Sequence, residues 1–204
     1  SLARRLLAGS SLEVKVNTTW LTSNVNSFPT EDRYDLVVVA YLLTELQPKQ
    51  RLAAIDAIWQ VCEKAAVFVE PGSMDGFQNV IEVRQRLLDL GGSVVAPCPH
   101  EDPCPLTAGD WCHFAARLNR TPLQRKLKSG VLSYEDEKHS FLVVTRGDGT
   151  RSSARVIRRP RMNPGHVILQ ICSQAGLRDI TVTKSDRDNY RRARKVRWGD
   201  SWND

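Results

Sequence analysis

The chain has 204 residues, of which 41% are hydrophobic and 25% are charged, and this composition indicates a globular protein of one large or two small domains. No apolar run approaches the roughly 20 residues that a membrane-spanning helix needs, so we expect no membrane partner. The net charge of +6 is unevenly distributed, because residues 151–197 hold 13 Lys and Arg against 3 Asp. Such a local excess of cations predicts a surface that binds nucleic acid.

The first half of the chain alternates between strand-like and helix-like segments. Short continuous apolar runs are typical of buried strands, and apolar residues three or four positions apart are typical of helices. In chain order, the predicted elements are a helix at 1–9, strands at 12–21 and 34–43, a helix at 48–64, a strand at 65–73, a helix at 75–92 and a strand from 92. This order predicts an α/β unit with parallel strands and right-handed crossovers.

The pattern changes in the second half. Asp110 is placed to cap a short helix at 111–120. Short strand candidates separated by Gly, Asp and Asn-Pro-Gly turns follow, and they predict a small β-rich module. They lie at 140–146, 154–161, 165–172 and 179–184, and a basic helix at 185–199 ends at Gly199.

Four cysteines are spaced in a way that suggests a metal site. Cys98, Cys104 and Cys112 lie in one Pro-rich run, and Cys172 follows 60 residues later. Zinc-finger sites bring their ligands in close pairs about 2–4 residues apart. The spacings here are wider, and four cysteines in an irregular loop also suit an iron–sulfur cluster. The residues alone leave zinc and a cluster equally open.

Three further residues near this pattern have plainer interpretations. His100 or His113 could replace a thiol in a zinc site, but a lone histidine is more often packed or exposed without a ligand. Cys62 lies on the apolar face of a predicted helix, and we expect it to be a core residue.

Several sequence motifs resemble one protein family. They are EPGS at 70–73 with GF at 76–77, APCPHEDPCPL, GDWCHFAARLNR, YEDEK at 134–138, RPRMNPGHVILQIC and YRRARKVRWGDSW. They are similar to the ribosomal small-subunit methyltransferase-like family, which has members in mitochondria and in bacteria. The resemblance runs from about residue 30 to the end of the chain.

The resemblance implies a fold and a metal. The fold is α/β, a partial class I methyltransferase-like (Rossmann-like) sheet without its N-terminal cofactor turn, followed by a β-rich module. The expected divisions are 1–96 for the α/β part, 97–120 for the cysteine loop and its helix, and 121–204 for the basic module. In mitochondrial members four cysteines hold a 4Fe–4S cluster. Cys98, Cys104, Cys112 and Cys172 match those positions, which favours the cluster over zinc.

The resemblance also implies a function and partners. Family members act in assembly or maturation of the small ribosomal subunit and contact its rRNA, so we expect those partners and a monomer away from the ribosome. The compact chain suggests the bacterial cytoplasm, with the mitochondrial matrix as the alternative. Phosphates of RNA would be met by Arg155, Arg158, Arg159, Arg161, Lys184, Arg187, Arg191, Arg192, Arg194, Lys195 and Arg197. Tyr190, Trp198 or Trp202 could stack on bases or serve as core residues.

The alternative function is an S-adenosylmethionine-dependent rRNA methyltransferase. Tyr41, Thr44 and Glu45 lie where an active-site rim would be, and Glu70 could assist them. The plain interpretation of these residues is strand-end and helix-cap chemistry. These 204 residues contain no Gly-rich turn after a first strand. We therefore expect S-adenosylmethionine to bind only a full-length form.

Overall fold

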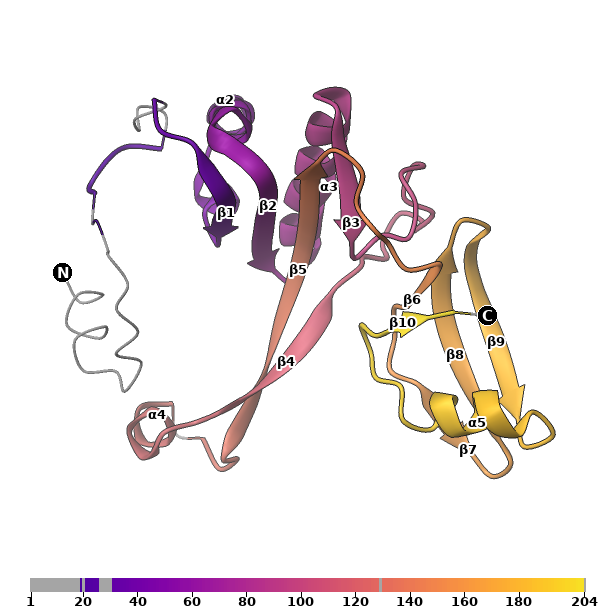
Figure 1. Cartoon of the computed structure of the whole chain (residues 1–204). Helices are drawn as coiled ribbons and strands as arrows, with labels where there is room; N and C mark the ends of the chain where they lie inside the picture. Colours follow the sequence, from indigo (N-terminus) through magenta and orange to yellow (C-terminus); the bar gives the residue numbers. More distant parts are fainter. Residues whose placement is uncertain (1–18, 20, 26–30, 129, 204) are drawn as a thin grey trace.

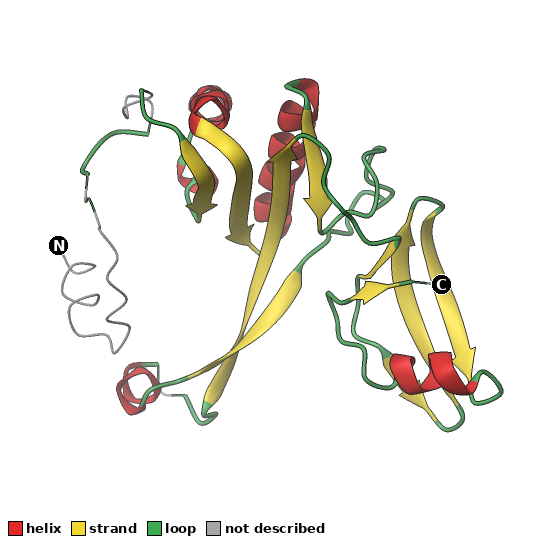
Figure 2. Cartoon of the chain, viewed as in Figure 1, coloured by secondary structure: helices red, strands yellow, loops and turns green. Residues whose placement is uncertain are grey.

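The computed structural model describes residues 19, 21–25, 31–128 and 130–203. The helix expected at 1–9 and most of the strand expected at 12–21 lie outside these residues. Two sheets lie side by side, and the cysteine-rich loop runs between them (Figure 1). The secondary structure is mixed α/β, as expected (Figure 2). Within the described residues, no helix has the length and apolar character needed to cross a bilayer.

The first sheet and its helices form what we call the first module, residues 34–146. Its strands are β1 (Tyr34–Ala40), β2 (Cys62–Pro71), β3 (Gly92–Ala96), β4 (Phe114–Asn119) and β5 (Tyr134–Arg146). The order is β1-β2-β5-β3, and β4 pairs with β5. The helices are η1 (Leu43–Glu45), α2 (Pro48–Val61), α3 (Met74–Asp89) and α4 (Pro122–Leu127).

The strands predicted to be parallel, β1, β2 and β3, all run in one direction, and the strand of this sheet that runs the opposite way is β5. β1 is parallel to β2, whereas β5 runs antiparallel to β2 and to β3. Strand β5 reaches its place through an antiparallel pairing with β4 and not through a crossover helix, and only crossovers impose parallel strands. Although residues 121–204 were expected to form one module, the structure places β5 in the first sheet.

The helix predicted at 111–120 is wrong. Residues Phe114–Asn119 form strand β4, and each of them pairs with β5. Two Ala, an Arg and a Leu favour a helix locally, but pairing with a long neighbouring strand outweighs that weak preference. Asp110 caps no helix; its carboxylate accepts a bond from the backbone N–H of Trp111.

The second sheet forms what we call the second module, residues 154–203. Its strands are β6 (Ala154–Val156), β7 (Arg161–Asn163), β8 (His166–Ser173), β9 (Gly176–Thr183) and β10 (Ser201–Trp202), all antiparallel. The basic helix predicted to reach residue 199 is shorter, because α5 covers Arg187–Ala193. Strand β8 is central and carries Val167, Leu169 and Ile171 into a small core with Trp202.

The core of the first module is larger. Helices α2 and α3 pack on the sheet and bury Phe68, Trp59, Leu87 and Leu142. Cys62 is buried in this core, as expected, but it is the first residue of β2 and not part of a helix. Two glycines of the EPGS–GF motif allow close backbone approach. A Cβ on Gly72 would lie 2.7 Å from the backbone of His139, and one on Gly76 would lie 2.0 Å from the carbonyl oxygen of Pro71.

Candidate metal centre

The four cysteines come from different parts of the fold and line one cavity. Cys98 follows β3, Cys104 lies in the loop, Cys112 precedes β4, and Cys172 lies in β8. The cavity, here called the cysteine cavity, has a volume of about 40 Å³, several times the roughly 10–15 Å³ that one water needs. Side chains of α3, of the first sheet and of the second module complete its wall. The residues therefore converge at the boundary between the modules.

The thiols have a chemistry that suits metal binding. All four cysteines are free and half-buried. Burial raises the pKa of Cys98 and of Cys112, and it raises the pKa of Cys172 to about 12, with Cys98 and Cys104 adding to the effect on Cys172. These three thiols are thus neutral by themselves at pH 7. A cation would be needed to stabilise thiolates here, and its binding would release protons.

The sulfurs share a cavity without forming a tight group. Within the described residues, no three His, Cys, Asp or Glu side chains are arranged to hold a metal ion. Neither histidine completes such a group. His100 is buried with its Nε2 3.5 Å from the sulfur of Cys172, and His113 stacks on Trp111 with 5.4 Å between ring centroids.

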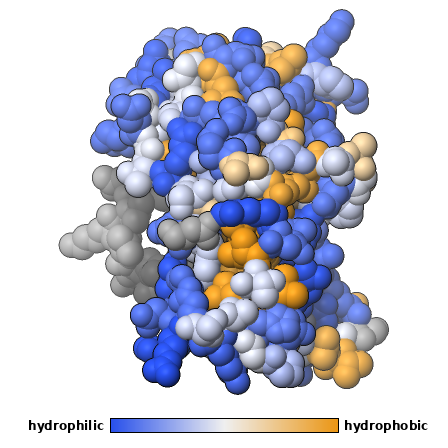
Figure 3. Space-filling view, turned by 90° about the vertical axis from the view of Figure 1, so that its right-hand side faces the viewer, coloured by the Kyte–Doolittle hydropathy of each residue, from blue (hydrophilic) through white to orange (hydrophobic). Residues whose placement is uncertain are grey.

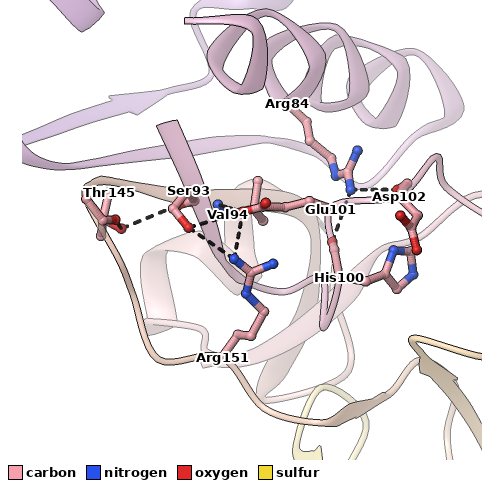
Figure 4. A network of polar contacts seen from close by, with 9 residues as sticks. Arg84, Ser93, Val94, His100, Glu101, Asp102, Thr145 and Arg151 are labelled. Carbon is pink, nitrogen blue, oxygen red and sulfur yellow. Dashed lines mark hydrogen bonds and ion pairs between the residues drawn. The ribbon is translucent and has the colours of Figure 1, made fainter. Parts of the chain in front are cut away.

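A buried arginine on α3 organises the loop beside the cavity. Arg84 is 3% exposed, and its guanidinium donates to the carbonyl oxygens of His100 (3.1 Å) and Asp102 (2.7 Å) (Figure 4). In the described part of the chain, its Nε and the Nδ1 of His100 have no hydrogen-bond partner. Such orphaned polar atoms are costly unless a group that they face compensates them.

A second arginine lines the same cavity from the second module. Arg155 donates from Nε to the carbonyl oxygen of Pro97 (3.0 Å) and from Nη1 to that of Gly199 (2.9 Å). Burial lowers its pKa, and the nearby Cys98 works in the opposite direction. Neither Arg84 nor Arg155 makes an ion pair with a carboxylate of the described residues. The cavity thus presents two cations and four thiols, a set that suits an anionic metal–thiolate group.

Polar contacts tie the cysteine loop to both modules. Glu101 accepts from Arg151 (2.6 Å), from the hydroxyl of Ser93 and from the backbone N–H of Val94 (Figure 4). Burial alone would raise the pKa of Glu101, but these three bonds outweigh it and lower the pKa. Ion pairing of Asp110 with Arg158 adds a further link between the loop and the second module.

The structure separates the eleven cations expected to bind RNA into two groups. Arg155 and Arg158 are half-buried and are engaged by the cysteine loop. Nine are exposed on the second module or its tail: Arg159, Arg161, Lys184, Arg187, Arg191, Arg192, Arg194, Lys195 and Arg197. Hydrophilic residues cover most of the molecular face seen from the side of this module (Figure 3). RNA binding by these residues stays a prediction.

The aromatic residues of the tail are mostly core residues. Trp202 is 2% exposed, and Arg192 lies over its ring at 4.7 Å. Trp198 is half-buried and packs edge-on against His113 with ring centroids 4.9 Å apart. Stacking on bases is therefore not available to Trp202 in this conformation.

Two of the four residues expected at an enzyme rim, Glu70 and Thr44, have structural partners. Glu70 is fully buried and accepts the backbone N–H groups of Leu43 (3.0 Å) and Thr44 (3.1 Å) and the hydroxyl of Thr44. These bonds hold η1 against the end of β2. Tyr41 has a positive φ of 55° at the end of β1. Strand-end and helix-cap chemistry therefore accounts for Glu70 and Thr44.

Three features characterise this chain: an α/β layer, a cationic antiparallel module and a cysteine-lined cavity between them. The family described as mitochondrial small ribosomal subunit Rsm22 matches residues 3–203, and the chain is a member of that family. The family resemblance seen in the sequence motifs is thereby confirmed.

Three relatives illustrate the match. The human ribosome assembly protein METTL17, mitochondrial, is 30% identical over 187 residues, which are 82% of this chain and 39% of the relative. The Rsm22-cox11 tandem protein 2, mitochondrial, of Schizosaccharomyces pombe is 26% identical over 218 residues, 83% of this chain and 29% of the relative. The ribosome assembly protein RSM22, mitochondrial, of Saccharomyces cerevisiae is 22% identical over 302 residues, 95% of this chain and 48% of the relative. The chain spans less than half the length of these relatives.

The expectation that the protein is located in the bacterial cytoplasm is wrong. All of these relatives are mitochondrial by name, and so is the family. The expectation relied on the compactness of the chain. A compact chain with short loops shows only that few insertions are present. It contains no information on location, because targeting signals are encoded in separate segments.

Sequence reasoning missed Arg84. The sequence shows one Arg in an amphipathic helix, and the packing of α3 against the cysteine loop buries it. A weak sequence signal was present, because Arg84 lies four positions after Val80 and three before Leu87, which puts it on the apolar face of the helix.

Proposed function

We propose that this chain is part of an assembly factor of the mitochondrial small ribosomal subunit, in which a 4Fe–4S cluster joins the two modules. Its ligands would be Cys98, Cys104, Cys112 and Cys172. The assembly role is supported by family membership and by the names of the human and budding-yeast relatives. The mitochondrial location follows from the same relatives.

The observation that carries the proposal is that four cysteines from separate elements line one cavity. Four thiolates at 2.3 Å from one zinc ion would have their sulfurs about 3.8 Å apart. The described cysteines form no group that tight. A cluster of four irons is larger and takes four cysteine ligands around its outside, so it fits a cavity with spread ligands better.

The positive charges around the cavity are suited to a cluster that is held by four thiolates. Four thiolates around a cluster leave a net negative charge, and Arg84 and Arg155 supply buried positive charge on opposite sides of the module boundary. When bound, the cluster would supply covalent iron–sulfur links between the cysteine loop and β8. Arg84 would hold the loop backbone in place through its bonds to two carbonyl oxygens.

In this proposal the second module binds rRNA. Its exposed cations would contact phosphates, and the cluster would hold that module in a set orientation on the first. Methyl transfer is not included, because Glu70 and Thr44 are occupied in holding η1. Micromolar binding of S-adenosylmethionine to this chain in calorimetry would restore the enzyme as a candidate.

Anaerobic purification followed by iron, sulfide and zinc analysis tests the metal. We expect about four irons and four sulfides per chain, with the broad visible absorbance of an iron–sulfur cluster. Replacing Cys104 by Ser should lower the iron content and weaken rRNA binding. One zinc without iron would contradict the cluster, and an intact fold with unchanged rRNA binding in Cys104→Ser would contradict its structural role.

A further inference from the structure

The first module carries a projecting arm that neither core explains. Strand β4 and the part of β5 that pairs with it, Tyr134–His139, extend away from the rest of the sheet (Figure 1). Helix α4 lies at the far end, and no residue of α4 is buried. Apart from Phe114 at its base, which is buried, the arm therefore does not serve to fill a core.

The end of the arm exposes an unusual number of large aliphatic side chains. Leu123 is 65% exposed, Leu127 is 76% exposed and Val131 is 96% exposed, and Leu118 and Leu132 are more than half exposed. We call these five residues the arm tip. Leu123 and Leu127 are four positions apart in α4, so they share one face of the helix. Single exposed leucines need no explanation, but a cluster at a projecting end does.

Local bonds hold the arm in shape. The guanidinium of Arg117 makes two bonds to Asp136 (2.7 and 2.9 Å) and lies 3.9 Å from the centre of the Tyr134 ring. Glu135 accepts from Arg120 (3.2 Å) and from Lys128 (3.1 Å). A reciprocal capping box between Thr121 and Gln124 begins α4.

These bonds compensate for the short length of α4. A helix of six residues is marginal by itself, because nucleation costs more than so few hydrogen bonds return. The capped and ion-paired arm therefore presents its leucines in a pre-organised arrangement, which lowers the entropy cost of binding.

The charges at the arm tip identify the partner. The carboxylates of Glu135 and Asp136 are already paired. Arg125 and Lys126 of α4 are exposed, and they make no ion pair with any carboxylate of the described residues. The arm tip thus combines an apolar face with two unpaired cations beside it. Its complement is an apolar groove with carboxylates on the rim.

We infer that the arm tip docks into an apolar, acid-rimmed groove of a protein component of the small-subunit particle. This inference rests on the proposed assembly function. Helix-in-groove docking uses leucines spaced as in α4. RNA is a poorer match, because it could use the two cations but would leave the exposed leucines and Val131 without an apolar partner.

The test uses the full-length natural protein and small-subunit particles from the same mitochondria. Replacing Leu123 and Leu127 together by Ser should lower the affinity for the particles at least about tenfold, as expected for buried anchor residues. The salt dependence of binding should stay unchanged, because no cation is removed. Leu52→Ser, an exposed leucine on α2, is the matched control and should bind like the wild type.

The outcomes separate this inference from the proposed function. If the wild type binds the particles and the double variant binds equally well, the docking surface is wrong and the assembly function stands. If the wild type does not bind them at all, the proposed function itself fails, and the inference with it.

The chemical identity of the contact is tested separately. A photo-reactive amino acid in place of Leu123 should form adducts with a protein of the particle. Adducts with rRNA or with a second copy of the chain would overturn the inference. The inference would also be overturned if the wild-type protein floated with vesicles of phosphatidylcholine and cardiolipin and the double variant did not.

Discussion

The two modules bury very different amounts of apolar side chain. In the first, α2 and α3 cover the sheet and enclose a core of large residues that includes Trp59, Phe68 and Leu142. In the second, a short helix covers a sheet whose core depends mainly on β8 and Trp202. A module of about fifty residues is near the lower limit for folding by its own core. We therefore expect the second module to depend on its links to the first, and the cysteine cavity, which both modules line, is one of these.

The largest effect on the second module is expected from removal of Cys172, the proposed metal ligand in β8. We expect Cys172→Ser to lose the proposed cluster and to destabilise the second module by about 2–5 kcal/mol, as for the loss of other structural cross-links. Hydrogen exchange of β8 and β9 amides should accelerate, while β2 and α3 stay protected.

Cys62→Ala is the control for that experiment. Cys62 is buried in the first core and does not line the cavity. This variant should lose about 1–2 kcal/mol of stability and keep its full iron content. Equal protection of β8 in the wild type and in Cys172→Ser would show that the second module is stable without the link.

The second prediction concerns which module supplies the cations that bind rRNA. Replacing Arg187, Arg194 and Lys195 by Ala should weaken rRNA binding about ten- to a hundredfold. It should also flatten the dependence of log affinity on log salt by about 0.7–0.9 for each phosphate that is no longer neutralised. These three exposed cations have no carboxylate partner in the described chain. Lys49→Ala and Lys64→Ala, on the first module, should leave the salt slope unchanged.

The third prediction concerns the charge beside the proposed cluster. Arg84→Gln removes a buried cation, so reduction of a bound cluster would add negative charge to a less compensated site. We expect the reduction potential to fall by about 50 mV, close to a tenfold change in the one-electron equilibrium. Arg84→Lys keeps the charge and should restore most of the potential, although it loses one of the two carbonyl bonds. Voltammetry on both proteins measures this, and equal potentials in the wild type and Arg84→Gln would exclude an electrostatic role.

The smallest expected effect is a pH dependence of the link through Glu101. Its pKa is lowered in the folded chain, so its bonds stabilise the fold above the ordinary carboxyl pKa. That contribution is lost as the pH falls from about 4.5 through the lowered pKa. Because the side chain is 38% exposed, solvent screening limits the effect to about 1 kcal/mol or less.

Glu101→Gln should therefore be less stable than the wild type at pH 7, and the difference should shrink as the pH falls below about 4.5. Thermal unfolding across this range measures the difference, and Glu63→Gln on the exposed side of β2 is the control. A difference that persists unchanged at pH 3 would mean that the contribution of Glu101 is not ionic.

Sequence reasoning succeeded where a local pattern determines local structure. The apolar periodicity of residues 48–64 and 75–92 gave α2 and α3 within a few residues, and the turns between short apolar runs located β8 and β9. It failed at residues 114–119, where helix-forming side chains sit in a strand because β5 supplies the pairing. The position of the antiparallel β5 between β2 and β3 was also not predicted, since no local signal reports which neighbour a strand will find.

The candidate site shows the same division. The sequence by itself determined the donor set of four cysteines and the concentration of cations in the last quarter, because residue type and spacing are properties of the chain. Only the tertiary structure decided that Cys172 lines the same cavity as the other three and that Arg84 is buried beside them. Arg155 was expected to be a surface cation, but the structure places it in the wall of the cysteine cavity. The physical reason is that burial and convergence depend on how sheets and helices pack, and residues 60 or more positions apart carry no record of that packing in their own neighbourhoods.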